Sequence, residues 1–125
     1  MRSATIVIPT LNEEGNVDAL MQQLNAVSSP ACDLKILFVD DQSDDQTVAK
    51  VHQWQQKQNN VDVLQRTGPR DLTQSVIDGA EYSQSDFVLV MDADLSHPSE
   101  KIPALLQPLV DGTHDLTVGS RYVNE

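Results

Sequence analysis

Phe87-Val88-Leu89-Val90-Met91-Asp92-Ala93-Asp94 is an apolar run that ends in two carboxylates separated by one small residue. Such a run predicts a strand buried on both faces, as in a parallel sheet. Residues i and i+2 of an extended segment face the same way, so Asp92 and Asp94 would lie about 6.6 Å apart on one side. Carboxylates this close repel each other unless a cation compensates, and Mg²⁺ and Mn²⁺ prefer carboxylate oxygens together with substrate phosphates. The pattern therefore predicts a divalent metal that holds a phosphorylated substrate.

Aspartates are also common just beyond strands as turn formers and helix caps, so the surrounding sequence has to decide. Along the whole chain, strand-like apolar runs alternate with stripes at helical spacing. The strand-like runs are Thr5–Ile8, Leu34–Val39, Val61–Leu64, Phe87–Met91 and Leu116–Val118, and the helical stripes run from Val17 to Val27, Val48 to Trp54, Leu72 to Ala80 and Ile102 to Leu109. This order predicts one α/β domain over residues 1–125, with a mostly parallel sheet and helices on both faces.

A polar cluster follows every predicted strand. In open parallel sheets, ligands bind outside the carboxyl ends of the strands. The clusters should therefore converge on one edge and form an acidic site there. They are Pro9–Glu14, Asp40–Asp45, Arg66–Asp71, Asp92–His97 and Gly119–Arg121.

The acidic clusters after the first two strands also have a simpler interpretation as helix caps. Asn12 would cap the first helix, and Ser43 or Asp44 would cap the second. Asp40 and Asp41 are harder to explain in this way, because a cap needs only one acceptor. A carboxylate at a strand end can instead accept hydrogen bonds from a nucleobase N–H or a ribose hydroxyl.

The arginines allow two interpretations as well. Arg66 and Arg70 are either solvated turn residues or donors to phosphates and base edges. Arg121, after the last strand, is a third arginine at the same predicted edge. Their side chains alone do not separate the alternatives.

Composition narrows the class of partner. The chain has 8 basic and 19 acidic residues and a net charge of -11, which argues against nucleic-acid binding and against a polybasic membrane patch. The single cysteine, Cys32, excludes an internal disulfide and is compatible with a reducing compartment. No signal peptide and no apolar stretch long enough to span a bilayer are visible, so we expect a cytoplasmic location.

Four motifs occur in an order that resembles family 2 glycosyltransferases, and most of all their dolichyl- or polyprenyl-phosphate sugar transferases. The similarity runs from residue 4 to residue 122. The motifs are Ile8–Glu13, Val39–Asp45, Val90–Pro98 and Val118–Tyr122.

The resemblance implies a Rossmann-like GT-A fold, a UDP- or GDP-sugar donor, Mg²⁺ or Mn²⁺, and inversion at the anomeric carbon. It also implies a polyprenyl or dolichyl phosphate acceptor, with the full-length protein peripheral at the cytoplasmic face of a membrane. By position in the motifs, the resemblance implies that the nucleotide is bound by Pro9, Thr10, Glu13, Asp40, Asp41, Arg70, Asp92 and Ala93. It implies that the metal is held by Asp92, Asp94 and Ser96. The catalytic residues would be Asp94 and Arg121.

The chain departs from the family pattern at two places and ends early. Ser96 stands where many relatives have Gln, and Asp71-Leu72-Thr73 stands where they often have Gly-Leu-Gly. GT-A enzymes normally continue with acceptor-binding elements beyond the equivalent of Glu125. We therefore expect the nucleotide-binding part of such an enzyme, which binds nucleotide with little or no transfer activity of its own.

The alternative is a phospho-receiver domain. Asp40 and Asp41 resemble its acidic pair, and Asp92 resembles its phospho-acceptor at the end of an apolar strand. Against this alternative, a full strand-helix unit precedes the acidic pair, and the lysine expected after the fifth strand is missing.

Overall fold

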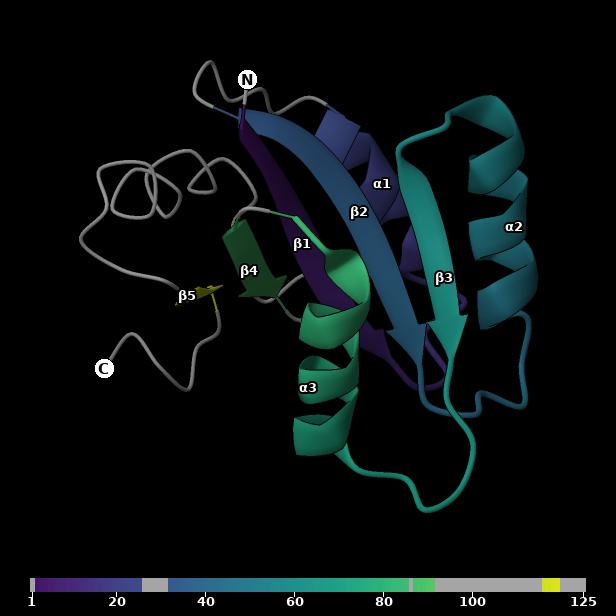
Figure 1. The fold of residues 1–125 in the computed structure, drawn as a ribbon. Coiled ribbons are helices and arrows are strands. Elements are labelled where there is room, and N and C mark those ends of the chain that lie inside the picture. Colours follow the sequence, from purple (N-terminus) through teal and green to yellow (C-terminus); the bar gives the residue numbers. More distant parts are fainter. Residues whose placement is uncertain (1, 26–31, 86, 92–115, 120–125) are drawn as a thin grey trace.

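The computed structural model describes residues 2–25, 32–85, 87–91 and 116–119 (Figure 1). Within them, five strands form one sheet in the order β3-β2-β1-β4-β5, and every neighbouring pair is parallel. The strands are β1 (Arg2–Thr10), β2 (Cys32–Asp40), β3 (Val61–Gln65), β4 (Phe87–Met91) and β5 (Leu116–Gly119), and the helices are α1 (Val17–Asn25), α2 (Thr47–Lys57) and α3 (Leu72–Ser83). The predicted α/β class and parallel sheet are confirmed. The helical stripe from Ile102 to Leu109 lies outside the described residues.

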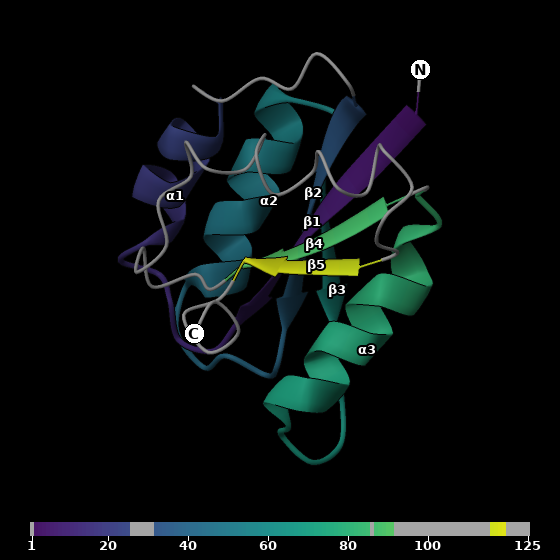
Figure 2. The ribbon, with the colours of Figure 1, turned by 90° about the vertical axis from the view of Figure 1, so that its left-hand side faces the viewer.

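The helices cover both faces of the sheet, as predicted. α1 and α2 lie on one face and α3 lies on the other (Figure 2). Parallel crossovers are right-handed, so the direction in which the chain steps across the sheet decides which face its helix covers. The steps from β1 to β2 to β3 run one way, whereas the step from β3 to β4 runs back across β2 and β1.

The larger part of the core lies beneath α1 and α2. Alternate residues of the central strands point to this face, because successive side chains of a strand point to opposite sides. The core there includes Ile6 and Ile8 of β1, Ile36 and Phe38 of β2, Leu89 and Met91 of β4, and Val17, Leu20, Met21 and Leu24 of α1.

The core beneath α3 is smaller, and α3 packs close to the strands. A Cβ atom at Gly79 would lie 2.6 Å from Val7 Cγ1 and 2.7 Å from Val39 Cγ2, so this close approach requires glycine. The predicted apolar stripe of α3 is wrong for two residues, since Leu72 is 58% and Ile77 is 42% exposed. The buried residues of α3 are instead Ser75 and Gly79, small residues whose place on the inner face the apolar pattern does not reveal.

No helix in the described part of the chain is both long and apolar enough to cross a membrane.

Candidate functional site

The sheet has a topological switch point between β1 and β4. These strands are neighbours in the sheet but are separated in the chain by β2 and β3. Ligands of open α/β sheets bind at the carboxyl end of such a pair, in the crevice that the diverging connections leave. The carboxyl ends of β1, β2 and β3 point toward the bottom of Figure 1, where the loops that follow them also lie.

Asp40, the last residue of β2, ties the ends of β1 and β2 together. Asp40 is 2% exposed and pairs in register with Thr10 of β1. The carboxylate accepts hydrogen bonds from Thr10 Oγ1 at 2.9 Å, Ser43 Oγ at 2.6 Å and Ser43 N at 2.9 Å. A buried carboxylate is costly unless hydrogen bonds or cations compensate. The donors to Asp40 therefore make it an anchor for both loops, and its predicted contact with the nucleotide stays a prediction.

Asp41 belongs to an ion-pair network. Its Oδ1 lies 2.6 Å from Arg66 Nη1, and its Oδ2 accepts a hydrogen bond from the Asp71 amide at 2.7 Å. Arg66 Nε donates in turn to Asp78 Oδ2 of α3 at 2.8 Å. The pKa of Arg66 is raised, mainly by its hydrogen bond to Asp78 and also by the charges of Asp41 and Asp78. Desolvation acts in the opposite direction but does not outweigh them. The network couples the end of β2, the loop after β3 and α3.

The interpretation of Arg66 as a solvated turn residue is wrong, because its side chain is only 8% exposed. The sequence did not single it out from Arg70, since both flank the same Gly-Pro turn. Arg70 is the exposed one, and its Nη2 donates to the Gln42 carbonyl at 2.7 Å. Gln42 has a φ of 70° and its side chain donates to the Gly68 carbonyl, which holds the loops after β2 and β3 together. The nucleotide contact predicted for Arg70 stays a prediction.

The two expected helix caps are wrong. Asn12 lies well before α1, with a φ of 55°, and its side chain accepts a hydrogen bond from the Asp44 amide at 3.0 Å. At α2, Gln46 occupies the cap position without a side-chain hydrogen bond. Asp45 accepts a hydrogen bond from the Thr47 amide at 2.9 Å instead. The capping signal identified the right segment but not the residue, because several acceptors follow one another there.

The remaining predicted residues fall into two groups. Pro9 and Thr10 are buried in β1, and Glu13 lies in the loop after it, where its Oε2 accepts a hydrogen bond from Asn16 Nδ2 at 2.8 Å. Predicted site residues that lie outside the described residues are Asp92, Ala93, Asp94, Ser96 and Arg121. Within residues 2–25, 32–85, 87–91 and 116–119, no three His, Cys, Asp or Glu side chains form a group that could hold a metal ion. β4 ends at Met91, directly before the predicted metal ligands.

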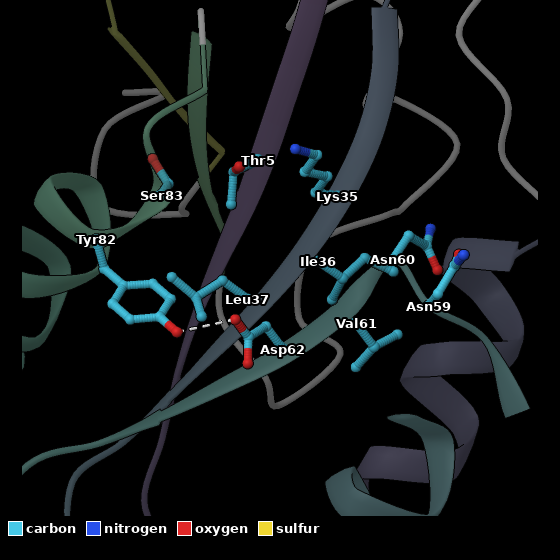
Figure 3. A pocket seen from close by; sticks show the side chains of 10 residues that line it. All are labelled: Thr5, Lys35, Ile36, Leu37, Asn59, Asn60, Val61, Asp62, Tyr82 and Ser83. Carbon is cyan, nitrogen blue, oxygen red and sulfur yellow. Dashed lines mark hydrogen bonds between the residues drawn. The ribbon is translucent and has the colours of Figure 1, made fainter. Parts of the chain in front are cut away.

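A cavity of about 560 Å³ lies at the other end of the sheet. Thr5, Leu37 and Asp62 line it from the strands, and Tyr82 and Ser83 line it from the last turn of α3 (Figure 3). The Tyr82 hydroxyl donates to Asp62 Oδ2 at 3.0 Å, and this hydrogen bond together with the charge of Asp62 raises the pKa of Tyr82. The cavity is therefore separate from the candidate site at the carboxyl end.

The chain matches the family model described as "Glycosyl transferase family 2" over residues 5–125. It is 38% identical over 120 residues to a dolichol-phosphate mannosyltransferase of Pyrococcus furiosus, covering 95% of this chain and 33% of that protein. It is 35% identical over 120 residues to the dolichol-phosphate mannosyltransferase of Saccharomyces cerevisiae, covering 94% of this chain and 44% of that protein. The chain thus spans less than half the length of these relatives.

Among solved structures, the fold is similar to that of a mannosyltransferase from Pyrobaculum calidifontis in complex with GDP-Man and Mn²⁺. The TM-score is 0.70 at 20% sequence identity, over 80% of this chain and 30% of that chain. The GT-A fold that the sequence motifs implied is confirmed.

The phospho-receiver alternative is not favoured. Besides the family match over residues 5–125, the sheet separates the acidic residues that a receiver would need side by side. Asp40 ends β2, whereas Asp92 follows β4, and β1 lies between these two strands.

Proposed function

The chain belongs to glycosyltransferase family 2, and on that premise we propose that it binds the nucleoside diphosphate of a nucleotide-sugar donor at the carboxyl end of its sheet. We further propose that the whole protein transfers the sugar to a polyprenyl or dolichyl phosphate, with inversion at the anomeric carbon. The names of the relatives from Pyrococcus furiosus and Saccharomyces cerevisiae support this acceptor class.

One observation carries the proposal. The loops after β1, β2 and β3 are hydrogen-bonded to one another around two buried aspartates, Asp40 and Asp41, next to the topological switch point. The Asn12 amide contributes from the first loop, and the Ser43 and Arg66 side chains contribute from the other two. A base and a ribose offer N–H and O–H donors that carboxylates at this position can accept. Ligands of open α/β sheets bind at this edge, and binding residues are disproportionately found on loops held by a rigid scaffold.

The family motifs imply further roles for residues outside the described part of the chain. Asp92, Asp94 and Ser96 would hold Mg²⁺ or Mn²⁺, which when bound stabilises the charge that the leaving nucleoside diphosphate gains. Arg121 would contact the donor phosphates or the acceptor phosphate through bidentate hydrogen bonds. A lipid phosphate is already ionised near neutral pH, so the attacking oxygen needs no strong general base.

Calorimetry on the 125-residue chain tests the donor site. We expect GDP or UDP, and the corresponding sugar nucleotides, to bind more tightly with Mn²⁺ than without it. Asp94→Asn should abolish this metal dependence, because it removes a charged ligand and leaves the size of the side chain almost unchanged.

Glu81→Gln is the matched control. Glu81 is exposed on α3, and this substitution removes one negative charge with little change in shape, as Asp94→Asn does. We expect it to retain metal-dependent binding. A folded chain that binds none of these nucleotides with Mn²⁺ would contradict the proposal.

A further inference from the structure

Three consecutive backbone amides of the loop after β1 point at side chains of the loop after β2. The amides belong to residues 12–14, and their acceptors belong to residues 43–47. Asn12 N donates to Ser43 Oγ at 2.8 Å, Glu13 N donates to Thr47 Oγ1 at 2.8 Å, and Glu14 N donates to Asp45 Oδ2 at 3.3 Å. Each amide thus has its own acceptor on the neighbouring loop, so the register between the two loops is fixed along three residues.

Thr47 is the central and most deeply buried of these acceptors. Its relative exposure is 0%, although it is the first residue of α2. The Thr47 hydroxyl accepts from Glu13 N and donates to Asp45 Oδ1 at 2.5 Å, so it links one loop to the other. Desolvation by burial opposes ionisation of Asp45, but hydrogen bonds from Thr47 and from the Glu14 amide lower the pKa of Asp45 overall. Asp45 therefore stays an acceptor near neutral pH.

Ser43 connects the same contact to the buried aspartate. Its hydroxyl accepts from Asn12 N and donates to Asp40 Oδ1, and Asp40 is also the acceptor for Thr10. Hydrogen bonds at Thr10 and at residues 12–14 thus hold the segment that contains Thr10 and Glu13 to the segment that contains Asp40 and Asp41.

We propose that Ser43, Asp45 and Thr47 are positioning residues for the nucleotide. They hold the amides of residues 12–14, and so place the nucleotide-contacting segment Pro9–Glu13 at a fixed distance from Asp40 and Asp41. This inference rests on the proposed function, because it assigns a role within the same site. A loop held in its bound arrangement loses less conformational entropy when the ligand binds.

The alternative is that the three residues act only as local structural elements that stabilise α2 and the loops. In that case their loss lowers stability, but the folded protein binds nucleotide as before. Affinity measured on fully folded variants separates the two possibilities, because a purely structural role does not change it.

The test compares Thr47→Val with Thr5→Val. Thr5 is 2% exposed in β1, and its hydroxyl is hydrogen-bonded to that of Ser85 at the opposite end of the sheet. Both substitutions remove one buried hydroxyl and keep the β-branched shape. We expect Thr47→Val to weaken nucleotide binding about tenfold, which is the equivalent of one hydrogen bond with a buried partner left unsatisfied, and Thr5→Val to leave affinity unchanged.

The affinities are measured by calorimetry with Mn²⁺ and whichever of GDP and UDP the parent chain binds more tightly, at a temperature where circular dichroism shows each variant fully folded. Thr47→Ser keeps the hydroxyl and should restore most of the affinity. Hydrogen exchange at the amides of residues 12–14 should accelerate in Thr47→Val alone.

The outcomes distinguish this inference from the proposed function. If the parent chain binds neither nucleotide, the proposed function is wrong. If the parent chain binds and Thr47→Val binds equally well, or if Thr5→Val weakens binding to the same extent, the positioning role is wrong while the donor site stands.

Discussion

The carboxyl end and the amino end of the same sheet differ in whether their charged side chains are buried. At the carboxyl end, Asp40 and Asp41 are 2% and 6% exposed, and each accepts hydrogen bonds from two other residues. At the amino end, the charged residues that line the cavity, Lys35 and Asp62, are exposed, and the buried polar residue Thr5 is neutral.

The comparison bears on which end of the sheet we propose as the nucleotide site. A cavity of about 560 Å³ lies at the amino end, but none of the residues that line it is a buried carboxylate. Buried carboxylates are costly unless donors compensate, so the donors around Asp40 and Asp41 set the carboxyl end apart from the amino end. The proposed donor site therefore rests on the network of donors around Asp40 and Asp41, at the edge of the sheet where ligands of α/β folds bind.

The largest expected effect comes from breaking the ion pair at the carboxyl end. Arg66→Met leaves Asp41 and Asp78 without their shared cation, and a buried charge that loses its partner is strongly destabilising. We expect the Tm to fall by roughly 10 °C, measured by thermal unfolding followed by circular dichroism. Arg70→Met, in the same loop, is the control, because Arg70 is exposed and donates only to a carbonyl.

Equal Tm values for the two arginine variants would show that burial of Arg66 has no energetic consequence. The difference between the two ends of the sheet would then be one of geometry only.

The next effect concerns α3, which runs from the carboxyl end to the amino end. Gly79→Ala places a Cβ atom within 2.7 Å of methyl groups on Val7 and Val39, so the helix has to move away from the sheet. Overpacking of this kind costs about 1–3 kcal/mol. We expect that loss in the free energy of unfolding, measured by urea denaturation.

Gly15→Ala is the control for the glycine substitution. A Cβ atom at Gly15 would meet nothing within 4 Å, so its stability should change little. A similar loss for both variants would contradict the close packing of α3 on β1 and β2.

The fold could be predicted from the sequence because it depends on patterns that are local. Apolar runs of strand length alternate with helical stripes, and that alternation determines the parallel sheet and the edge at which Asp40 and Asp41 emerge. Even so, the prediction of which residues of α3 face the sheet was partly wrong, because Ser75 and Gly79 are buried there whereas Leu72 and Ile77 are exposed.

The contacts within the site could not be predicted in the same way. Arg66 pairs with Asp78, which lies 12 positions further along the chain and on a different element, so no spacing rule connects them. Thr47 holds Glu13 across 34 positions of sequence. Such pairings depend on how two loops are placed side by side, and this placement follows only from the assembled sheet.

The smallest expected effect is a difference between the two ends in how the free energy of unfolding depends on pH. At the carboxyl end, hydrogen bonds from Gln74 and Arg66 lower the pKa of Asp78. Its contribution to stability is therefore fully present above the unfolded pKa of about 3.9 and is lost as the pH falls through the lowered value. Asp78→Asn should reduce the acid dependence of the free energy of unfolding.

At the amino end the pH dependence of stability has the opposite sign. The hydrogen bond to Asp62 raises the pKa of Tyr82, so its contribution is fully present below the unfolded pKa of about 10 and is lost as the pH rises through the raised value. Tyr82→Phe should remove this alkaline loss, as measured by urea denaturation across pH. Tyr82 is 47% exposed, so solvent screening keeps the effect small. If the alkaline loss persists in Tyr82→Phe, the hydrogen bond between Tyr82 and Asp62 is not its source.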